Sequence, residues 1–310
     1  MSTLKISNIH TLVTVDDEYR VLHDVDVLVE GDKIHSIGKN LPTPQGARVI
    51  DGRWCVVYPG FVNTHHHFYQ TLTRNLPAVQ DAKLFDWLLW LYEVWRGLHP
   101  EAVRVSTQIA LGELLLSGCT TSTDHFYVFP RSAPREFLDI EIDTAREMGV
   151  RFHPTRGSMS LGRSQGGLPP DDVTQSWEDI LADCDRLISK YHDPKPFAMT
   201  RIVLAPCSPF SVTRESLAET AVFARRKKVY MHTHLCETND EQDFCVQKLG
   251  MRPLEYMESV GWVGPDVWYA HGIWFTPEEI TRLGKMNCGV AHCPVSNLRL
   301  GSGICHVPDL

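Results

Sequence analysis

The most informative part of this sequence, for both fold and chemistry, is Pro59-Gly60-Phe61-Val62-Asn63-Thr64-His65-His66-His67 (PGFVNTHHH). It closes an apolar run that is predicted to form a strand over 56–63. Residues two apart on an extended chain point to the same side, so His65 and His67 share a face and His66 points away. Neutral imidazoles bind zinc or iron well, so the stretch predicts part of a metal site. The alternative is a polar surface loop that happens to carry three histidines.

Three later strands also end in histidine. His232-Thr233-His234-Leu235-Cys236-Glu237 closes one of them, and His271 and His292 close two more. A carboxylate beside a metal can accept a proton from water, and Glu237 stands at such a place, although a solvated glutamate is the alternative. A single histidine at a strand end, such as His271 or His292, is more often structural than catalytic. Together, at successive strand ends, they predict one metal site, because barrel enzymes place their chemistry at the carboxyl ends of their strands.

The segment from Pro59 onward alternates short apolar runs with helical stretches, which is typical of a parallel α/β sheet. Strands are predicted over 56–63, 120–126, 150–155, 201–205, 229–234, 267–270 and 289–292. Helices are predicted over 100–117, 140–148, 177–191, 215–226, 252–260 and 277–285. This pattern predicts a (β/α)8 TIM-type barrel over 59–310. Because seven strands are counted before the sequence ends, we expect the barrel to be truncated before strand 8, with unpaired edges on its first and seventh strands.

Residues 1–58 show alternating apolar residues without a helical period, and they predict a small β-domain. Glu30-Gly31-Asp32-Lys33 is predicted to be its hairpin turn. The expected division is therefore 1–58 for the β-domain and 59–310 for the barrel.

The composition is that of a globular chain: 310 residues, 43% hydrophobic and 22% charged, with a net charge of −8. No basic block appears, so we expect no nucleic-acid partner. No apolar run reaches 18 residues, so we expect no membrane partner. The nine cysteines are scattered and form no CxxC motif, which favours a reduced, cytoplasmic protein. A homo-oligomer is left open.

The histidine motifs resemble those of the amidohydrolase superfamily, in its aminohydrolase branch. The HxH of His65 and His67, the HxxE of His234 and Glu237, and His271 carry this resemblance. Longer stretches are similar to bacterial 8-oxoguanine deaminases, with hydroxy-triazine aminohydrolases close. They are Asn63–Arg74 (NTHHHFYQTLTR), Gly118–Asp124 (GCTTSTD), His153–Ser160 (HPTRGSMS), Ala205–Thr213 (APCSPFSVT) and His292–Gly303 (HCPVSNLRLGSG).

The resemblance implies a role for each of these residues. His65, His67 and His234 would bind one divalent metal, zinc first and iron as the alternative. The fourth ligand of the family, an aspartate on strand 8, has no counterpart in this chain. Strand 201–205 lacks the lysine of two-metal members, so one metal is expected. Residues 1–58 would be part of a β-sandwich.

Glu237 and His271 would be the catalytic proton shuttles. The residues expected to bind substrate are Gln70, His292, Trp95 and Arg156, whereas His66 and His232 are expected to be structural.

The implied reaction is hydrolytic deamination of a small N-heterocycle, 8-oxoguanine to urate plus ammonia, as in purine catabolism. An aminohydrolase of hydroxy-triazines or of guanine is the alternative. Ser208-Pro209-Phe210 stands where guanine deaminases carry an Arg-Phe pair, which speaks against guanine. A non-catalytic binding module on the same fold is an alternative of another class. Metal analysis together with an ammonia-release assay would separate a catalyst from such a module.

Overall fold

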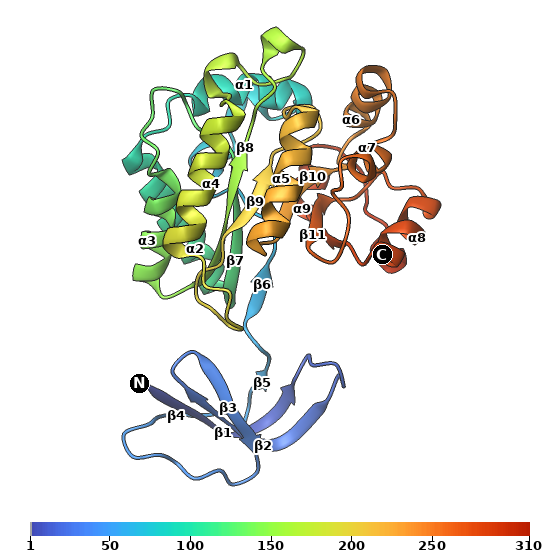
Figure 1. The fold of residues 1–310 in the computed structure, drawn as a ribbon. Coiled ribbons are helices and arrows are strands. Elements are labelled where there is room, and N and C mark those ends of the chain that lie inside the picture. Colours follow the sequence, from blue (N-terminus) through green and yellow to red (C-terminus); the bar gives the residue numbers. More distant parts are fainter. Residues whose placement is uncertain (1) are drawn as a thin grey trace. The chain divides into compact units, whose positions relative to one another are not determined.

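The computed structural model describes residues 2–310, and the chain divides after Phe61 into two compact units (Figure 1). None of the helices among the described residues combines the length and the apolar character needed to cross a membrane.

The first unit is built on a five-stranded sheet in the order β3-β2-β1-β4, with β5 also paired to β1. Its strands are β1 (Thr3–Val13), β2 (Val21–Glu30), β3 (Lys33–Gly38), β4 (Arg48–Asp51) and β5 (Val56–Val57). The predicted hairpin turn is confirmed, because β2 ends at Glu30, β3 begins at Lys33 and the two strands pair antiparallel. Gly31 adopts a φ of 64°, which glycine reaches without strain.

The core of this unit is small, and it is formed by side chains of β1 and β2. Ile9, Leu12, Val25 and Val27 are buried together. A buried ion pair of 3.0 Å joins Lys5 on β1 to Asp26 on β2.

The second unit holds a seven-stranded sheet whose strands follow one another in chain order. They are β6 (Phe61–Asn63), β7 (Cys119–Phe126), β8 (Arg151–Ser158), β9 (Val203–Pro206), β10 (Met231–Leu235), β11 (Val267–His271) and β12 (Gly289–Ala291). The pairs from β7 to β12 are parallel. Each predicted strand has a counterpart, but the first prediction was wrong in its extent. Val56–Val57 pairs with β1, and Pro59, which cannot donate to a ladder, lies between it and β6.

Helices connect the strands, as Figure 1 shows for α4 and α5 beside β8 and β9. The six predicted helices are confirmed as α2 (Pro100–Leu116), α3 (Phe137–Met148), α4 (Trp177–Tyr191), α5 (Arg214–Lys227), α7 (Pro253–Ser259) and α8 (Pro277–Met286). Their starts are encoded locally: the hydroxyl groups of Ser176, Thr213 and Thr276 accept backbone N–H groups in the first turns of α4, α5 and α8.

Three helices were not predicted: α1 (Leu84–Trp95), α6 (Asn239–Phe244) and α9 (Pro294–Arg299). The α1 sequence is apolar on nearly all sides, so it shows no helical period. The other two have six residues each, which is too short for a periodic signal. Short helical elements complete the described chain: five 3-10 helices, η1 (Phe68–Thr73), η2 (Pro77–Val79), η3 (Arg163–Gln165), η4 (Asp171–Val173) and η6 (Val307–Asp309), and one π-helical turn, η5 (Cys245–Leu249).

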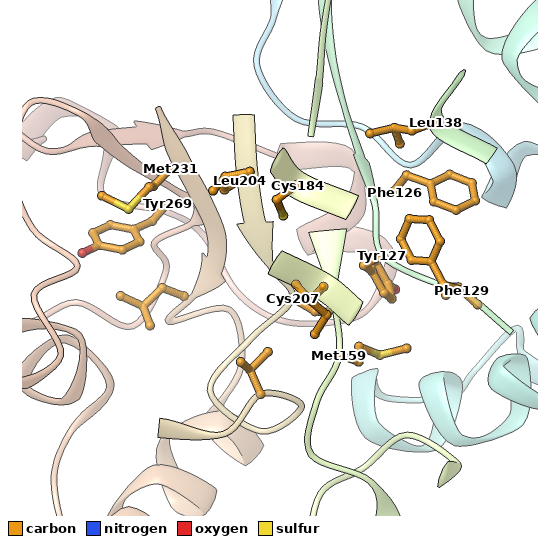
Figure 2. Close-up of a cluster of buried hydrophobic side chains, with 14 of the residues drawn as sticks. Phe126, Tyr127, Phe129, Leu138, Met159, Cys184, Leu204, Cys207, Met231 and Tyr269 are labelled. Atoms are coloured by element: carbon orange, nitrogen blue, oxygen red, sulfur yellow. The ribbon is translucent and has the colours of Figure 1, made fainter. Parts of the chain in front are cut away.

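The core of the second unit lies between the sheet and its helices. Figure 2 shows side chains from neighbouring strands, among them Phe126, Leu204, Met231 and Tyr269, in one buried cluster. Such burial contributes about 25 cal/mol per Å2 of apolar surface. It fixes the strands in parallel register, so that the residues following their carboxyl ends meet at one edge of the sheet.

Candidate functional site

Four histidines meet at the carboxyl ends of β6, β7 and β10. His65, His67, His125 and His234 each offer a ring nitrogen, and these nitrogens lie within 4.8 Å of one another. Two hydrogen bonds donated by backbone N–H groups hold the loop after β6 against the end of β7. The His125 N–H donates to the His66 carbonyl at 2.7 Å, and the Phe68 N–H donates to the Asp124 carboxylate at 2.6 Å.

The tautomers of His67 and His234 follow from their hydrogen bonds. The Nδ1 of His67 lies 2.7 Å from the His125 carbonyl oxygen, and the Nδ1 of His234 lies 2.6 Å from the Cys207 carbonyl oxygen. A carbonyl only accepts, so both Nδ1 atoms carry the proton and both Nε2 atoms keep a lone pair. These Nε2 atoms are 3.1 Å apart. Two facing lone pairs attract a cation between them, and this donor pair therefore fits a metal ion.

A relay fixes His65 in the same way. The Nδ1 of His232 donates to the Trp268 carbonyl at 2.9 Å, which leaves the Nε2 of His232 as an acceptor. The Nδ1 of His65 donates to this Nε2 at 2.7 Å. The remaining Nε2 of His65 is buried, keeps its lone pair and has no hydrogen-bond partner among residues 2–310. His232, expected to be structural, therefore orients an expected ligand, which is how outer residues support metal sites.

His125 belongs to this group but was missed in the sequence. Its Nε2 donates to the Ala205 carbonyl at 2.9 Å, so its Nδ1 keeps the lone pair, and this buried atom has no partner within the described chain. Its ring stacks on that of His234 with 4.5 Å between the centroids. The signal that could have identified it is a histidine at the end of the strand predicted over 120–126. No second histidine lies two residues away to form an HxH motif, so His125 was missed.

Burial keeps these rings neutral. Removal from water lowers the pKa of His65, His67 and His125 well below the usual value. The same effect lowers the pKa of His234 to about 3, with a further contribution from His271. A neutral imidazole is the form that binds a metal, so the cluster is in its ligand form at neutral pH.

Glu237 and His271 form a buried acid–base pair beside the cluster. Oε2 of Glu237 lies 3.4 Å from Nε2 of His271, and the two side chains are 6% and 4% exposed. Desolvation raises the pKa of Glu237 to about 8 and lowers that of His271 to about 4. The pair can therefore hold one proton and pass it on near neutral pH.

Asn297 on α9 is a second residue that the sequence analysis missed. Its Oδ1 lies 2.8 Å from Nδ1 of His271. This bond places the His271 proton on Nδ1 and turns the Nε2 lone pair toward Glu237. Asn297 stands in the stretch quoted for His292, five residues further on, and only the folded chain brings it to β11.

A cavity of about 730 Å3 opens onto these groups, and Gln70 and His292 line it as expected substrate-binding residues. Apolar side chains of α1 and of the segment after β9 form part of its wall: Leu84, Trp87, Leu88 and Phe210. A wall that combines aromatic and aliphatic side chains with a few polar groups suits a small heterocyclic ring. His66, expected to be structural, also lines the cavity.

Two of the expected substrate-binding residues lie elsewhere. Trp95 is 1% exposed in the core, where its indole N–H donates to Thr73 at 3.2 Å. Arg156 is also 1% exposed, and its guanidinium is bound to Asp183 at 2.6 Å and stacked over Phe129. Neither residue lines the cavity. Because a buried guanidinium needs a charged partner, Arg156 is committed to the packing of β8 against α4.

Comparison with known proteins agrees with this geometry. The model of the amidohydrolase family matches residues 56–310. The 8-oxoguanine deaminase of Pseudomonas aeruginosa is 52% identical over 269 residues, which are 87% of this chain and 60% of that protein. The hydroxydechloroatrazine ethylaminohydrolase of Pseudomonas sp. (strain ADP) is 39% identical over 321 residues, covering 100% of this chain and 66% of that protein.

Among solved structures, the atrazine chlorohydrolase of Arthrobacter aurescens TC1 complexed with zinc superposes with a TM-score of 0.94 at 32% identity. The match covers 99% of this chain and 69% of that one. The chain thus spans about three fifths to two thirds of the length of these relatives. The match runs through both the histidine cluster and the Glu237–His271 pair, and this chain belongs to the amidohydrolase family.

Proposed function

We propose that the protein is a metal-dependent aminohydrolase that hydrolytically deaminates a small N-heterocycle. The observation that carries this proposal is the convergence of three histidine Nε2 lone pairs beside the buried Glu237 carboxyl group at the floor of a cavity. A buried carboxyl group that lines a cavity and has a raised pKa is typical of a catalytic acid or base, which favours an enzyme over a non-catalytic binding module.

The metal is proposed to be a single divalent ion, zinc first and iron as the alternative, held by His65, His67 and His234. A bound ion would supply a lowered pKa for water and electrostatic stabilisation of developing negative charge. The cavity lies beside these ligands, so substrate and ion would meet there. The zinc complex of the related chlorohydrolase supports zinc.

In the proposed reaction, Glu237 takes a proton from water, and the oxygen of that water attacks the ring carbon that carries the amino group. His271, oriented by Asn297, lies 3.4 Å from the Glu237 carboxyl group, and its Nε2 lone pair stabilises the tetrahedral centre by accepting a hydrogen bond from the new hydroxyl group. Glu237 delivers this proton to the ring nitrogen. It then takes a second proton from the hydroxyl group of the tetrahedral centre and gives it to the amino group, which leaves as ammonia while the ring carbon becomes the carbonyl carbon of the oxo-heterocycle.

The proposed substrate is 8-oxoguanine, with urate and ammonia as products. The name of the 52% identical relative supports this choice. A hydroxy-triazine is the second candidate, because the relative at 39% identity is a hydroxydechloroatrazine ethylaminohydrolase. Gln70, half-buried on the wall, is proposed to hydrogen-bond the heterocycle, and exposed His292 is proposed to contact it at the cavity rim.

A substrate panel tests this choice. We expect kcat/KM for ammonia release from 8-oxoguanine to exceed that for guanine and for hydroxy-triazines by about 10²-fold or more, because unmatched polar groups in a buried site are costly. A coupled ammonia assay on the zinc-loaded protein, with substrate-free and metal-free controls, measures it. A larger value for a triazine would transfer the assignment to the second candidate. No turnover of any member by fully loaded protein would contradict the proposed function.

The metal affinity should depend little on pH between 5.5 and 7. A free imidazole gains a proton as the pH falls through its ordinary value near 6.5, and that proton competes with the metal. Burial lowers the pKa of His234 to about 3, so the folded site gains no such proton in this range. Chelator competition at several pH values, corrected for the protonation of the chelator, measures the zinc affinity. A tenfold loss for each unit below pH 6.5 would show that the rings titrate normally.

The finer architecture is also proposed. The seven strands in chain order, joined by helices, are typical of a (β/α)8 barrel, and the sheet of the first unit would be part of a β-sandwich. We also propose that the β-domain ends at residue 58 and the barrel begins at residue 59. The protein is further proposed to be cytoplasmic and to bind a small heterocycle.

A further inference from the structure

Glu241 on α6 has an unusual set of hydrogen bonds. Its Oε1 accepts the backbone N–H of Cys236, and its Oε2 accepts the backbone N–H of Glu237, each at 2.9 Å. Glu241 is fully buried. Both oxygens of one carboxylate are thus used to hold two consecutive peptide groups, and the second of these belongs to the proposed catalytic residue.

The contrast with α8 shows that ordinary helix capping does not explain these bonds. At α8, the Glu279 side chain returns to the N–H of the capping residue Thr276 at 2.8 Å, which is the common capping box. At α6, Thr238 is the capping residue, and Glu241 occupies the position that corresponds to Glu279. Its carboxylate instead bonds to the two residues before the cap.

The turn that Glu241 holds is strained and is tied to the next strand. Cys236 adopts a φ of 55°, which is costly for a residue with a Cβ. Its carbonyl accepts the N–H groups of Ile273 and Trp274 at 2.8 and 3.0 Å. These two residues follow His271, which itself has a φ of 78°. Cys236 is therefore bonded to Glu241 on one side and to the turn after His271 on the other.

The orientation of Glu237 depends on this arrangement. Its side chain must leave the chain in one direction to reach within 3.4 Å of His271. A relaxed Cys236 would rotate the following peptide group and turn the Glu237 carboxyl group away. Surrounding bonds must over-determine a strained backbone if it is to persist, and the Glu241 carboxylate supplies two of them.

We propose that Glu241 is a positioning residue, which holds the backbone of Cys236 and Glu237 so that the Glu237 carboxyl group faces His271. This inference rests on the proposed function, because it assigns Glu241 to the reaction in which Glu237 moves protons. Glu241 does not line the cavity, so it would act through Glu237.

The test compares Glu241→Gln with Glu279→Gln in the full chain loaded with zinc. A glutamine has one acceptor oxygen and one NH2 group, so it can accept only one of the two N–H groups and faces the other with a donor. For Glu241→Gln we expect kcat to fall about 10- to 100-fold, as for other supporting residues, with KM within about threefold and zinc content unchanged. For Glu279→Gln, which likewise loses a buried acceptor at a helix start, we expect a lower melting temperature and kcat within about twofold.

Hydrogen–deuterium exchange gives a readout that does not depend on turnover. We expect faster exchange at the amides of Cys236 and Glu237 in Glu241→Gln, and no change there in Glu279→Gln. Should Glu241→Gln not fold, Glu241→Asp replaces it, because a side chain one methylene shorter cannot reach both N–H groups.

The inference is overturned if the Glu241 variant keeps wild-type kcat, or if both variants lose kcat equally, which would indicate a general effect of stability. Loss of zinc from Glu241→Gln would also overturn it, because the residue would then support the ligands. The proposed function fails separately, when the wild-type protein binds zinc and still deaminates nothing.

Discussion

The double variant His67→Ala with His234→Ala is expected to lose its metal and at least about 10³-fold in kcat/KM. The two Nε2 atoms face each other at 3.1 Å, and each has its tautomer fixed by a backbone carbonyl, so together they form the inner pair of the proposed site. A metal that polarises water contributes several kcal/mol to the transition state, and each 1.36 kcal/mol is tenfold in rate. Elemental analysis after gel filtration and an ammonia-release assay measure the two effects.

His153→Ala is the matched control for the double variant. His153 is also a histidine of the sheet, on β8, but it does not belong to the cluster. It should keep a full complement of metal. Stoichiometric metal in the double variant, at wild-type affinity, would place the site elsewhere.

Glu237→Gln is expected to lower kcat by about 10²- to 10⁴-fold while the zinc content stays at the wild-type level, because the amide keeps the shape but cannot accept a proton. Steady-state assays at saturating substrate, with metal analysis of the same sample, measure it. Wild-type kcat in this variant would remove Glu237 from the mechanism.

The same variant has a consequence for the stability of the metal-free chain. Burial raises the pKa of Glu237 from its ordinary value of 4.5 to about 8, so the folded chain holds a proton that the unfolded chain releases between these values. The stability from this group is present below about pH 4.5 and is lost as the pH rises toward 8. Glutamine has no such dependence. Metal-free Glu237→Gln should therefore gain in melting temperature relative to wild type between pH 5 and pH 8.5, and an unchanged difference would contradict the raised pKa.

The sequence predicted the elements that have a local signal. Residues close in sequence predict the strands that end in histidine and the helices that begin with a hydroxyl cap such as Ser176. The α1 helix is not, because it is apolar on nearly all sides and becomes a helix through tertiary packing of Leu84, Leu88 and Leu91.

The site divides in the same way. Spacing alone brings His65 and His67 to one face, and their meeting with His234 follows from the parallel sheet. No neighbouring residue in the sequence forms a motif with His125 or Asn297. Each is recognised only by a contact between distant residues: His125 with the Ala205 carbonyl, and Asn297 with His271. The prediction that Trp95 and Arg156 bind substrate depended on contacts that the sequence does not show. Nothing near Arg156 in the sequence indicates that Asp183, 27 residues further on, neutralises its charge.

The relay from Trp268 through His232 to His65, together with the carbonyl bonds of His67 and His234, has a consequence for ion selectivity. These hydrogen bonds fix the tautomer of each ring before any ion binds, so the same nitrogen atom of each ring is always available as a ligand. Magnesium and calcium prefer oxygen ligands, and magnesium gives up its water reluctantly. Zinc and ferrous iron accept imidazole without that cost. Selectivity against magnesium and calcium would thus come from neutral imidazole nitrogens whose tautomers are fixed by hydrogen bonds to backbone carbonyl groups.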